Sequence, residues 1–150
     1  MEKLRKRGLR EDSQTAFQNT NDAIGIRVIC SFVEDVYRIA EWLEKRDDIQ
    51  IIEKKDYIAY PKQNGYRSLH LIVRFTATKD LQDITAEIQL RTIAIDFWAA
   101  LEHQLKYKRS VHHEEIIRRE LKKCADEIAS VDLSMQTIRD ILQSEAWINM

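Results

Sequence analysis

The sequence predicts an α+β fold, in which a mixed and largely antiparallel β-sheet is flanked by helices and followed by a long helical C-terminal region. Three candidate strands between residues 49 and 91 follow one another without a helix between them, which implies antiparallel pairing. Stretches with a helical spacing of apolar residues precede and follow these strands. Glycine (3) and proline (1) are scarce in the 150 residues, which favours long regular elements over loops.

The composition is that of a soluble globular protein. Hydrophobic residues make up 44% and charged residues 33%, and the length suits one domain with a single core. No apolar run is long enough to cross a bilayer and no signal-peptide pattern is visible, so we expect no membrane association. Cys30 and Cys124 have no metal-binding spacing, and we expect reduced thiols in a cytoplasmic protein.

The first elements are a helix end, a loop, a strand and a helix. Residues 1–7 have the composition of the end of a helix, and the polar residues 9–21 predict a loop. The nearly continuous apolar run at residues 22–32 predicts a central strand buried on both faces. Arg27 interrupts this run, and because a lone buried charge is unfavourable, Arg27 is a candidate for binding. Apolar residues at helical spacing predict a helix at 34–46.

Three strands are expected at residues 49–58, 67–75 and 84–91, with a loop at 60–65 and a polar turn at 76–83. In the second strand, Leu69, Leu71 and Val73 share one face and His70 lies on the other. In the last strand, three apolar residues alternate with three polar ones, which are Glu87, Gln89 and Arg91. Charge on a strand face is unfavourable unless something binds there, so this polar face is a candidate site.

Two helical regions complete the chain. Thr92 can cap a helix whose apolar face carries Ile93, Phe97, Ala100, Leu101 and Leu105. Asp96 and His103 lie on nearly one side of this helix, and the alanines between them leave room for a flat ligand. Residues 112–144 are amphipathic and predict one long helix or two, packed on the domain or on another subunit. We expect the aromatic residues Trp42, Phe97 and Trp98 in the core.

The polar residues together suggest phosphoryl-type transfer. Two carboxylates on separate strands, Asp22 and Glu87, suit Mg²⁺, which takes few protein oxygens. Four basic residues suit phosphates, and they are Arg27, Lys62, Arg67 and Arg91. Tyr66 follows a glycine in a loop and offers its ring to a nucleobase. The chain has neither the Gly-x-x-x-x-Gly-Lys-Ser/Thr motif nor a His-Asp metal cluster of the phosphohydrolase kind.

Each of these residues also has a simpler interpretation when it is taken alone. Asp22 could merely open a strand after a loop, and His70 could be an ordinary hydrogen-bonded strand histidine. Tyr66 could pack beside its turn, while Asp96, Glu102 and His103 could form a solvated helix face. The functional interpretation rests on finding these residues together and in one order.

Three segments in series resemble the RelA/SpoT synthetase domain, the (p)ppGpp synthetase or GTP pyrophosphokinase family. They are Asp-Ala-Ile-Gly-Ile-Arg-Val-Ile from Asp22, Lys-Gln-Asn-Gly-Tyr-Arg-Ser-Leu-His from Lys62, and the stretch from Glu87 to Lys108 that begins Glu-Ile-Gln-Leu-Arg-Thr. The resemblance covers about residues 3–108. We expect residues 1–108 to form the synthetase core and residues 109–150 a helical extension of the same domain, as in the small alarmone synthetases.

The resemblance implies a nucleotidyltransferase-like fold and transfer of the β,γ-pyrophosphate of ATP to the ribose 3′-hydroxyl of GDP or GTP, in the stringent response. It makes Asp22, Glu87 and His70 catalytic, with Asp22 and Glu87 holding Mg²⁺ and Glu87 acting as general base. It assigns Lys3, Arg27 and His70 to ATP. It assigns the acceptor nucleotide to seven residues: Lys62, Asn64, Tyr66, Gln89, Asp96, Glu102 and His103.

The resemblance also indicates a departure and a rival. Family members carry an ATP-binding Arg-x-Lys segment before the position of Lys3, and we expect that this N-terminal segment is missing here. The rival interpretation is therefore a non-catalytic module that binds guanine nucleotides, or single-stranded RNA through its basic surface. The apolar stripe of the C-terminal region suggests self-association, and the small synthetases are typically homotetramers.

Overall fold

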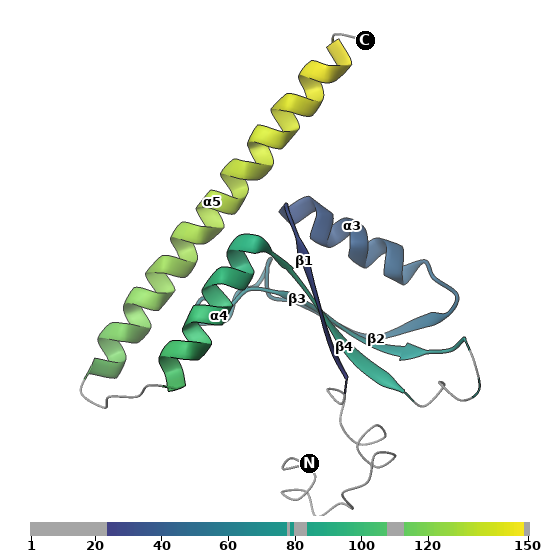
Figure 1. Cartoon of the computed structure of the whole chain (residues 1–150), viewed down its shortest axis with the longest axis horizontal. Coiled ribbons are helices and arrows are strands. Elements are labelled where there is room, and N and C mark those ends of the chain that lie inside the picture. Colours follow the sequence, from purple (N-terminus) through teal and green to yellow (C-terminus); the bar gives the residue numbers. More distant parts are fainter. Residues whose placement is uncertain (1–23, 78, 80–83, 108–112, 149–150) are drawn as a thin grey trace, which may run out of the picture.

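The computed structural model describes residues 24–77, 79, 84–107 and 113–148 (Figure 1). Its elements are β1 (Gly25–Cys30), α3 (Val33–Glu44), β2 (Ile49–Asp56), β3 (Leu69–Phe75), β4 (Thr85–Thr92), α4 (Ile93–Tyr107) and α5 (Glu114–Ile148). The predicted α+β class is confirmed, and so is every strand and helix expected within these ranges. The helix end at 1–7, the loop at 9–21 and the candidate site residues Lys3 and Asp22 lie outside the described residues.

The four strands form one mixed sheet in the order β1-β4-β3-β2. β2 pairs with β3 and β3 pairs with β4 in antiparallel fashion, whereas β1 runs parallel to β4. In this register Glu87 lies beside Gly25 of β1 on one side and Ile72 of β3 on the other. His70 lies beside Gln89. The antiparallel pairing of the consecutive strands β3 and β4 thus brings their polar residues next to one another.

The expectation that the first strand is central and buried on both faces is wrong. β1 is an edge strand in the described part of the chain, and most of its residues are exposed (Figure 1). The side chain of Arg27 is 54% exposed, so it is not the buried lone charge that the sequence suggested. An apolar run shows that a segment suits a strand, but it does not reveal how many neighbours that strand has.

The main core lies between α3 and one face of the sheet. Its fully buried members come from α3, β3 and β4 and include Val36, Ala40, Leu69, Leu71, Val73, Ala86 and Leu90. The members on β3 and β4 are the apolar positions that strand alternation predicted, and those on α3 follow the predicted helical spacing. The aromatic expectations are only partly right: Trp98 is buried, whereas Trp42 and Phe97 are exposed. Trp42 instead lies on the surface of α3 under the guanidinium of Arg46.

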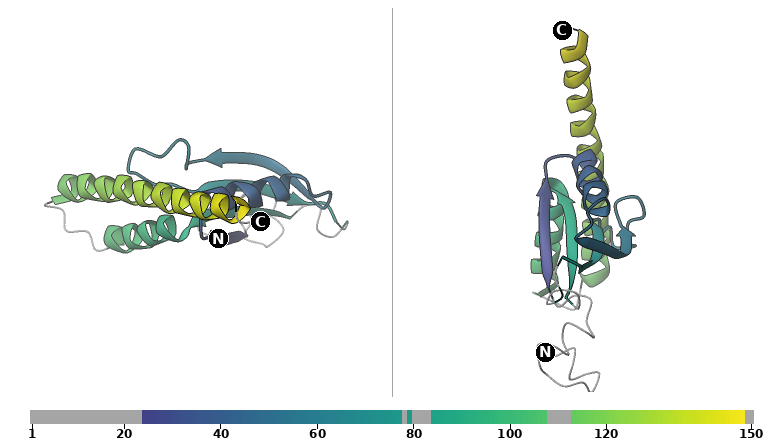
Figure 2. Two further views of the ribbon diagram at one scale, coloured as in Figure 1. Left: turned by 90° about the horizontal axis from the view of Figure 1, so that it is seen from above. Right: turned by 90° about the vertical axis from the view of Figure 1, so that its right-hand side faces the viewer.

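The C-terminal region is one continuous helix of 35 residues, which settles the choice between one helix and two. The first part of α5 packs beside α4, and its C-terminal part extends past the rest of the molecule (Figure 2). None of the described helices, α5 included, is both long enough and apolar enough to cross a membrane. The C-terminal half of α5 exposes Leu133, Met135, Ile138, Ile141, Leu142, Trp147 and Ile148.

Candidate active site

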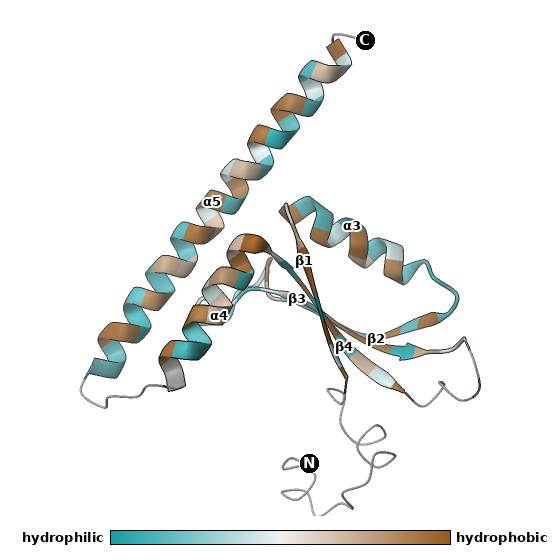
Figure 3. Ribbon diagram, viewed as in Figure 1, coloured by the Kyte–Doolittle hydropathy of each residue, from teal (hydrophilic) through white to brown (hydrophobic). Residues whose placement is uncertain are grey.

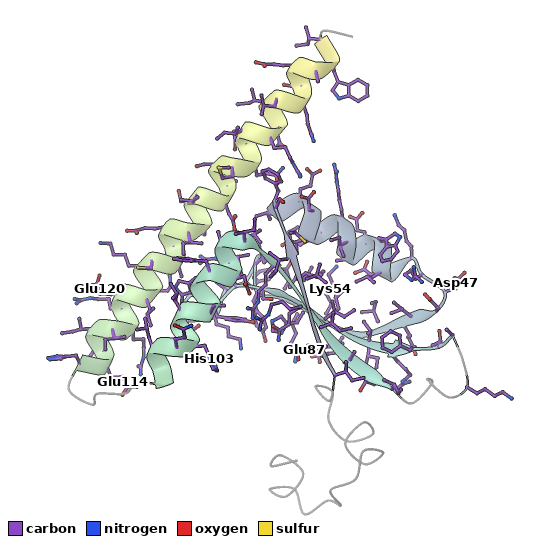
Figure 4. All side chains as sticks on the ribbon, viewed as in Figure 1. Asp47, Lys54, Glu87, His103, Glu114 and Glu120 are labelled. Carbon is purple, nitrogen blue, oxygen red and sulfur yellow. The ribbon has the colours of Figure 1, made fainter. Side chains whose placement is uncertain are left out.

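The polar face predicted on the last two strands is present, on the side of the sheet away from α3. Leu69, Leu71 and Val73 point into the core beneath α3, so His70 projects from the opposite face of β3. The same alternation in β4 places Glu87, Gln89 and Arg91 on that opposite face, and Figure 4 shows Glu87 at the sheet. A regular two-residue period therefore creates a line of polar side chains on a rigid support.

Five side chains on this face form a closed set of contacts, which we call the polar ring: Tyr66, His70, Glu87, Gln89 and Arg91. Arg91 Nη2 donates to Tyr66 Oη (3.0 Å) and to Gln89 Oε1 (2.9 Å). Gln89 Nε2 donates to Glu87 Oε1 (2.7 Å), and His70 Nδ1 lies 3.3 Å from the same oxygen. Tyr66 Oη and His70 Nε2 close the ring at 2.8 Å.

The ring fixes where its protons lie. A guanidinium only donates, so Tyr66 Oη accepts from Arg91 and directs its own proton to His70 Nε2. The imidazole proton is then on Nδ1, facing Glu87. Burial lowers the pKa of His70, against the opposing effect of the Glu87 carboxylate, so the neutral form is favoured. Glu87 thus receives two donors on Oε1, and within the described chain its Oε2 accepts none.

The loop that carries Tyr66 is a preformed turn. Gly65 N–H donates to Lys62 O (2.9 Å), and Lys62 N–H donates to Tyr66 O (3.1 Å). Gly65 has a φ of 92°, a conformation that side chains disfavour, which explains glycine at this position. Asn64 Oδ1 accepts from Tyr66 N–H (3.0 Å), so the oxygen of this candidate residue is engaged within the loop and its Nδ2 remains for a ligand.

An aromatic cluster surrounds the tip of this loop. The ring of Tyr57 lies edge-on to Tyr66 (6.1 Å between centroids) and to His70 (5.3 Å). Lys62 Nζ lies 4.7 Å from the ring centroid of Tyr57 and 5.1 Å from that of Tyr66. Tyr57 was not predicted as a site residue, because a tyrosine at the end of a strand carries no signal of its own.

Asp96, in the first turn of α4, joins the ring to the edge strand. Its Oδ1 accepts from Arg91 Nη1 (3.1 Å) and lies 3.6 Å from Arg27 Nη1. Thr92 Oγ1 accepts from Ile95 N–H (3.1 Å), which confirms the predicted cap of this helix. Arg27 of β1, Arg91 of β4 and Asp96 of α4 therefore meet at one corner of the sheet.

The other residues predicted on α4 have different environments. Glu102 is buried and His103 is exposed, about two turns beyond Asp96 (Figure 4). The expected space beside two alanines is only half present. Ala99 is buried with Trp98 and Ala125 of α5, and Ala100 alone is exposed. A helix in isolation does not show which of its sides a later helix will cover.

Two arginines have roles that the sequence did not predict. Arg67 was expected to serve phosphates, but its guanidinium binds α5. Arg91 was predicted on the polar face and as a phosphate ligand, but its guanidinium holds three other polar side chains and its side chain is 6% exposed. Its Nε is buried without a hydrogen-bond acceptor among the described residues. The position of Arg91 on the polar face is a signal for its role. No local pattern in the sequence shows that Arg67 contacts α5, because Ala125 lies 58 residues further along the chain.

The described part of the polar face contributes one candidate metal ligand, Glu87. The described residues contain no group of three or more His, Cys, Asp or Glu arranged to hold an ion. Glu87 fits a Mg²⁺ ligand, since Oε2 is available and this ion takes few protein oxygens. Glu87 N–H donates to Ile24 O (2.8 Å), and Asp22 is two residues before Ile24 in the sequence. The predicted pairing of Asp22 with Glu87 remains a prediction.

Comparisons with known proteins agree with this arrangement. Residues 1–112 match the family described as a region found in RelA / SpoT proteins. The chain is 40% identical to GTP pyrophosphokinase YwaC of Bacillus subtilis (strain 168) over 139 residues, which are 91% of this chain. It is 35% identical to GTP pyrophosphokinase YjbM of the same organism over 128 residues, which are 84% of this chain.

A solved structure resembles the whole described fold. It is the small alarmone synthetase 1 of Bacillus subtilis bound to its product pppGpp, with a TM-score of 0.78 and 33% identity. The similarity covers 95% of this chain and 72% of that one. The chain spans 66% of the length of YwaC and 61% of that of YjbM. With a family match over well more than half of its residues, the chain belongs to the RelA/SpoT family.

Proposed function

We propose that this chain is the catalytic part of a GTP pyrophosphokinase, which transfers the β,γ-pyrophosphate of ATP to the 3′-hydroxyl of GDP or GTP. The observation that carries the proposal is the polar ring, which links a loop tyrosine suited to a nucleobase with a strand carboxylate suited to a hydroxyl proton. Membership of the RelA/SpoT family and a relative solved with pppGpp support it.

In the proposed reaction, the 3′-oxygen of the acceptor attacks the β-phosphorus of ATP. The bond between that phosphorus and the oxygen bridging to the α-phosphate breaks, and AMP leaves. Glu87 takes the hydroxyl proton on Oε2, because Oε1 is held by Gln89 and His70. The donors on Oε1 keep the carboxylate oriented, and orientation and charge neutralisation supply most of the catalysis in such transfers.

The acceptor nucleotide lies along the loop and α4 in this proposal. Tyr66 stacks on guanine, and Lys62 moves from the tyrosine rings to a phosphate. Asn64 offers Nδ2, and Gln89 borders the acceptor with the carboxamide that links Arg91 to Glu87. Three residues of α4 complete the acceptor side: Asp96, Glu102 and His103.

The donor nucleotide is assigned to Arg27, which is exposed on the edge strand, and to His70 and Lys3. Asp22 and Glu87 would hold Mg²⁺, which neutralises phosphate charge when it is bound. The neutral Nδ1–H tautomer of His70 keeps Glu87 in place beneath the reacting groups.

We also propose the wider setting. Residues 1–108 form the synthetase core and residues 109–150 its helical extension, within one domain located in the cytoplasm. A homotetramer is supported by apolar residues that recur along α4 and α5, brown in Figure 3, and whose side chains stay exposed. On α4 these are Ile93, Phe97, Leu101 and Leu105, and on α5 they continue to Ile148.

The test is an assay of this chain with ATP, GDP or GTP, and Mg²⁺, in which AMP and (p)ppGpp are separated by anion-exchange chromatography. We expect both products in equal amounts, and neither when Mg²⁺ is replaced by a chelator. If AMP is absent while calorimetry still detects GDP, the chain is a guanine-nucleotide binding module and the enzyme proposal is wrong. Binding of single-stranded RNA that weakens with salt would instead favour the second form of the module.

A further inference from the structure

The loop that carries Lys62, Asn64 and Tyr66 is called the acceptor loop below. Arg67, the residue after Tyr66, attaches this loop to α5 through hydrogen bonds. Arg67 Nη1 donates to the backbone oxygen of Ala125 at 2.8 Å and to that of Gly65 at 3.4 Å. Arg67 Nη2 donates to Asp126 Oδ1 at 3.2 Å. The guanidinium therefore joins the loop backbone to the backbone of a helix that lies 58 residues further along the chain.

The loop also presses directly on the same turn of α5. Gly65 is buried, and a Cβ built on it would lie 2.5 Å from Ala125 Cβ and 3.2 Å from Lys122 Cδ. Such distances leave no space for a side chain, so the loop and the helix are in backbone-level contact. This contact and the positive φ of Gly65 are separate reasons for glycine at this position.

An apolar contact extends this attachment to the ring of Tyr66. Tyr66 packs against a buried cluster formed by Trp98, Ala99 and Ala125. Trp98 Nε1 donates to Leu121 O at 2.8 Å, which ties α4 to the same stretch of α5. The residues of α5 from Leu121 to Ile128 thus contact the loop, the base-stacking tyrosine and α4 together.

We propose that Arg67 is a positioning residue for the acceptor nucleotide, and that the Leu121–Ile128 stretch of α5 is a structural part of the acceptor site. The inference rests on the proposed function, because it supposes that Tyr66 receives the base. Arg67 itself contacts no substrate. It fixes the position and orientation of the acceptor loop by bonding that loop to α5.

The two hydrogen bonds of Arg67 to α5 differ in strength. The Ala125 carbonyl is a buried acceptor on a helix, and a charged donor to such a group makes a strong bond. Asp126 is exposed and is also bonded by Lys122 Nζ at 2.7 Å, so its pairing with Arg67 is screened by water and shared. The bond to Ala125 is therefore the one that positions the loop.

The test compares Arg67→Met with Asp126→Asn in GDP binding by calorimetry and in steady-state transfer. Arg67→Met keeps the aliphatic stem and deletes the donors, and we expect the Kd and KM for GDP to rise about tenfold. The kcat at saturating GDP and the KM for ATP stay near their wild-type values. Asp126→Asn is the matched control, with less than about a twofold change in any of these. Arg67→Lys should recover part of the affinity.

A purely structural role gives a different pattern, in which GDP binding is unchanged and only the thermal midpoint falls. That pattern, or equal losses in the KM values for GDP and ATP, contradicts the inference. If Arg67→Met does not fold, Gly65→Ala carries the test, because it separates the loop from Ala125 and should raise the GDP Kd in the same way. Wild-type chain that binds GDP without forming AMP overturns the proposed reaction, while the GDP Kd values still decide the role of Arg67.

Discussion

The apolar side of α4 that carries Ile93, Phe97, Leu101 and Leu105 is called the outer face here. The acceptor loop and this outer face lie close in the fold, but they differ in how much of their surface contacts the rest of the chain. In the loop region, the backbone is fixed by a turn, by Arg67 and by contact with α5. On the outer face of α4, Phe97 is 59% exposed, and its apolar neighbours Ile93, Leu101 and Leu105 are exposed as well. The acceptor loop is held by contacts within the described chain, whereas the outer face of α4 is left uncovered there.

This contrast distinguishes a preformed ligand site from a surface that another protein surface has to cover. A site for small nucleotides has to be rigid before they arrive, and the polar ring provides that by joining five side chains in a closed set of bonds. An apolar helix face has to be buried by something, and a contiguous patch of this kind marks an interface. The following changes test whether the two regions act independently, from the largest expected effect to the smallest.

Glu87→Gln should remove the general base from the polar ring. The amide cannot take the 3′-hydroxyl proton, and loss of a general base lowers rates by about 10²–10⁴. Gln can still accept from Gln89 Nε2, so the ring and GDP affinity should persist. Quantification of AMP release, with GDP calorimetry as the control, checks this. A variant with wild-type turnover excludes Glu87 as the base.

Tyr66 separates stacking from ring integrity. Tyr66→Ala should weaken GDP binding about ten- to a hundredfold, because a stacked base contributes about 1–3 kcal/mol. Tyr66→Phe keeps the stacking face and removes the hydroxyl that links Arg91 to His70, so it should bind GDP well but turn over more slowly. Equal GDP affinities for the Ala variant and the wild type would show that the base binds elsewhere.

Phe97→Glu tests the outer face of α4. A carboxylate in the centre of an apolar interface is unfavourable, and we expect self-association to weaken at least about tenfold. Analytical ultracentrifugation over a range of concentrations measures this. Trp42→Glu is the matched control, since Trp42 is also exposed but lies on α3. Were both variants to sediment like the wild type, the α4 face would not be the contact between copies.

Asp132 joins α5 to the start of α4 and should give the smallest effect. It lies on α5 and accepts from Thr92 Oγ1 at 2.6 Å, the same hydroxyl that caps α4. Burial raises the pKa of Asp132, so the folded chain retains this proton to a higher pH than the unfolded chain does. Its stabilising contribution is therefore full below the ordinary pKa of 3.8 and falls as pH rises through the folded value.

Asp132→Asn removes this titration and keeps an acceptor for Thr92. The free energy of unfolding should change by at most about 1 kcal/mol at neutral pH, and its decline with rising pH above 3.8 should flatten. Urea unfolding of both proteins from pH 4 to pH 7 makes the comparison. A steeper decline in the variant contradicts the assignment.

The sequence predicted much of the site because strand alternation is a local property. Once β3 and β4 were identified, the period of two residues placed Glu87, Gln89 and Arg91 on one face and Leu69, Leu71 and Val73 under a helix. The same holds for the Thr92 cap, whose hydrogen bond spans three residues. Interactions over a few residues depend on backbone geometry that the sequence reveals directly.

Only the tertiary structure decided what each element faces. It made β1 an edge strand and exposed Arg27, although the apolar run suggested burial. It left the apolar side of α4 uncovered while burying Ala99 against α5, and it directed Arg67 away from the ligand side to the backbone of Ala125. Periodicity defines the sides of a strand or helix, but burial depends on partners many residues away, and no local pattern specifies them.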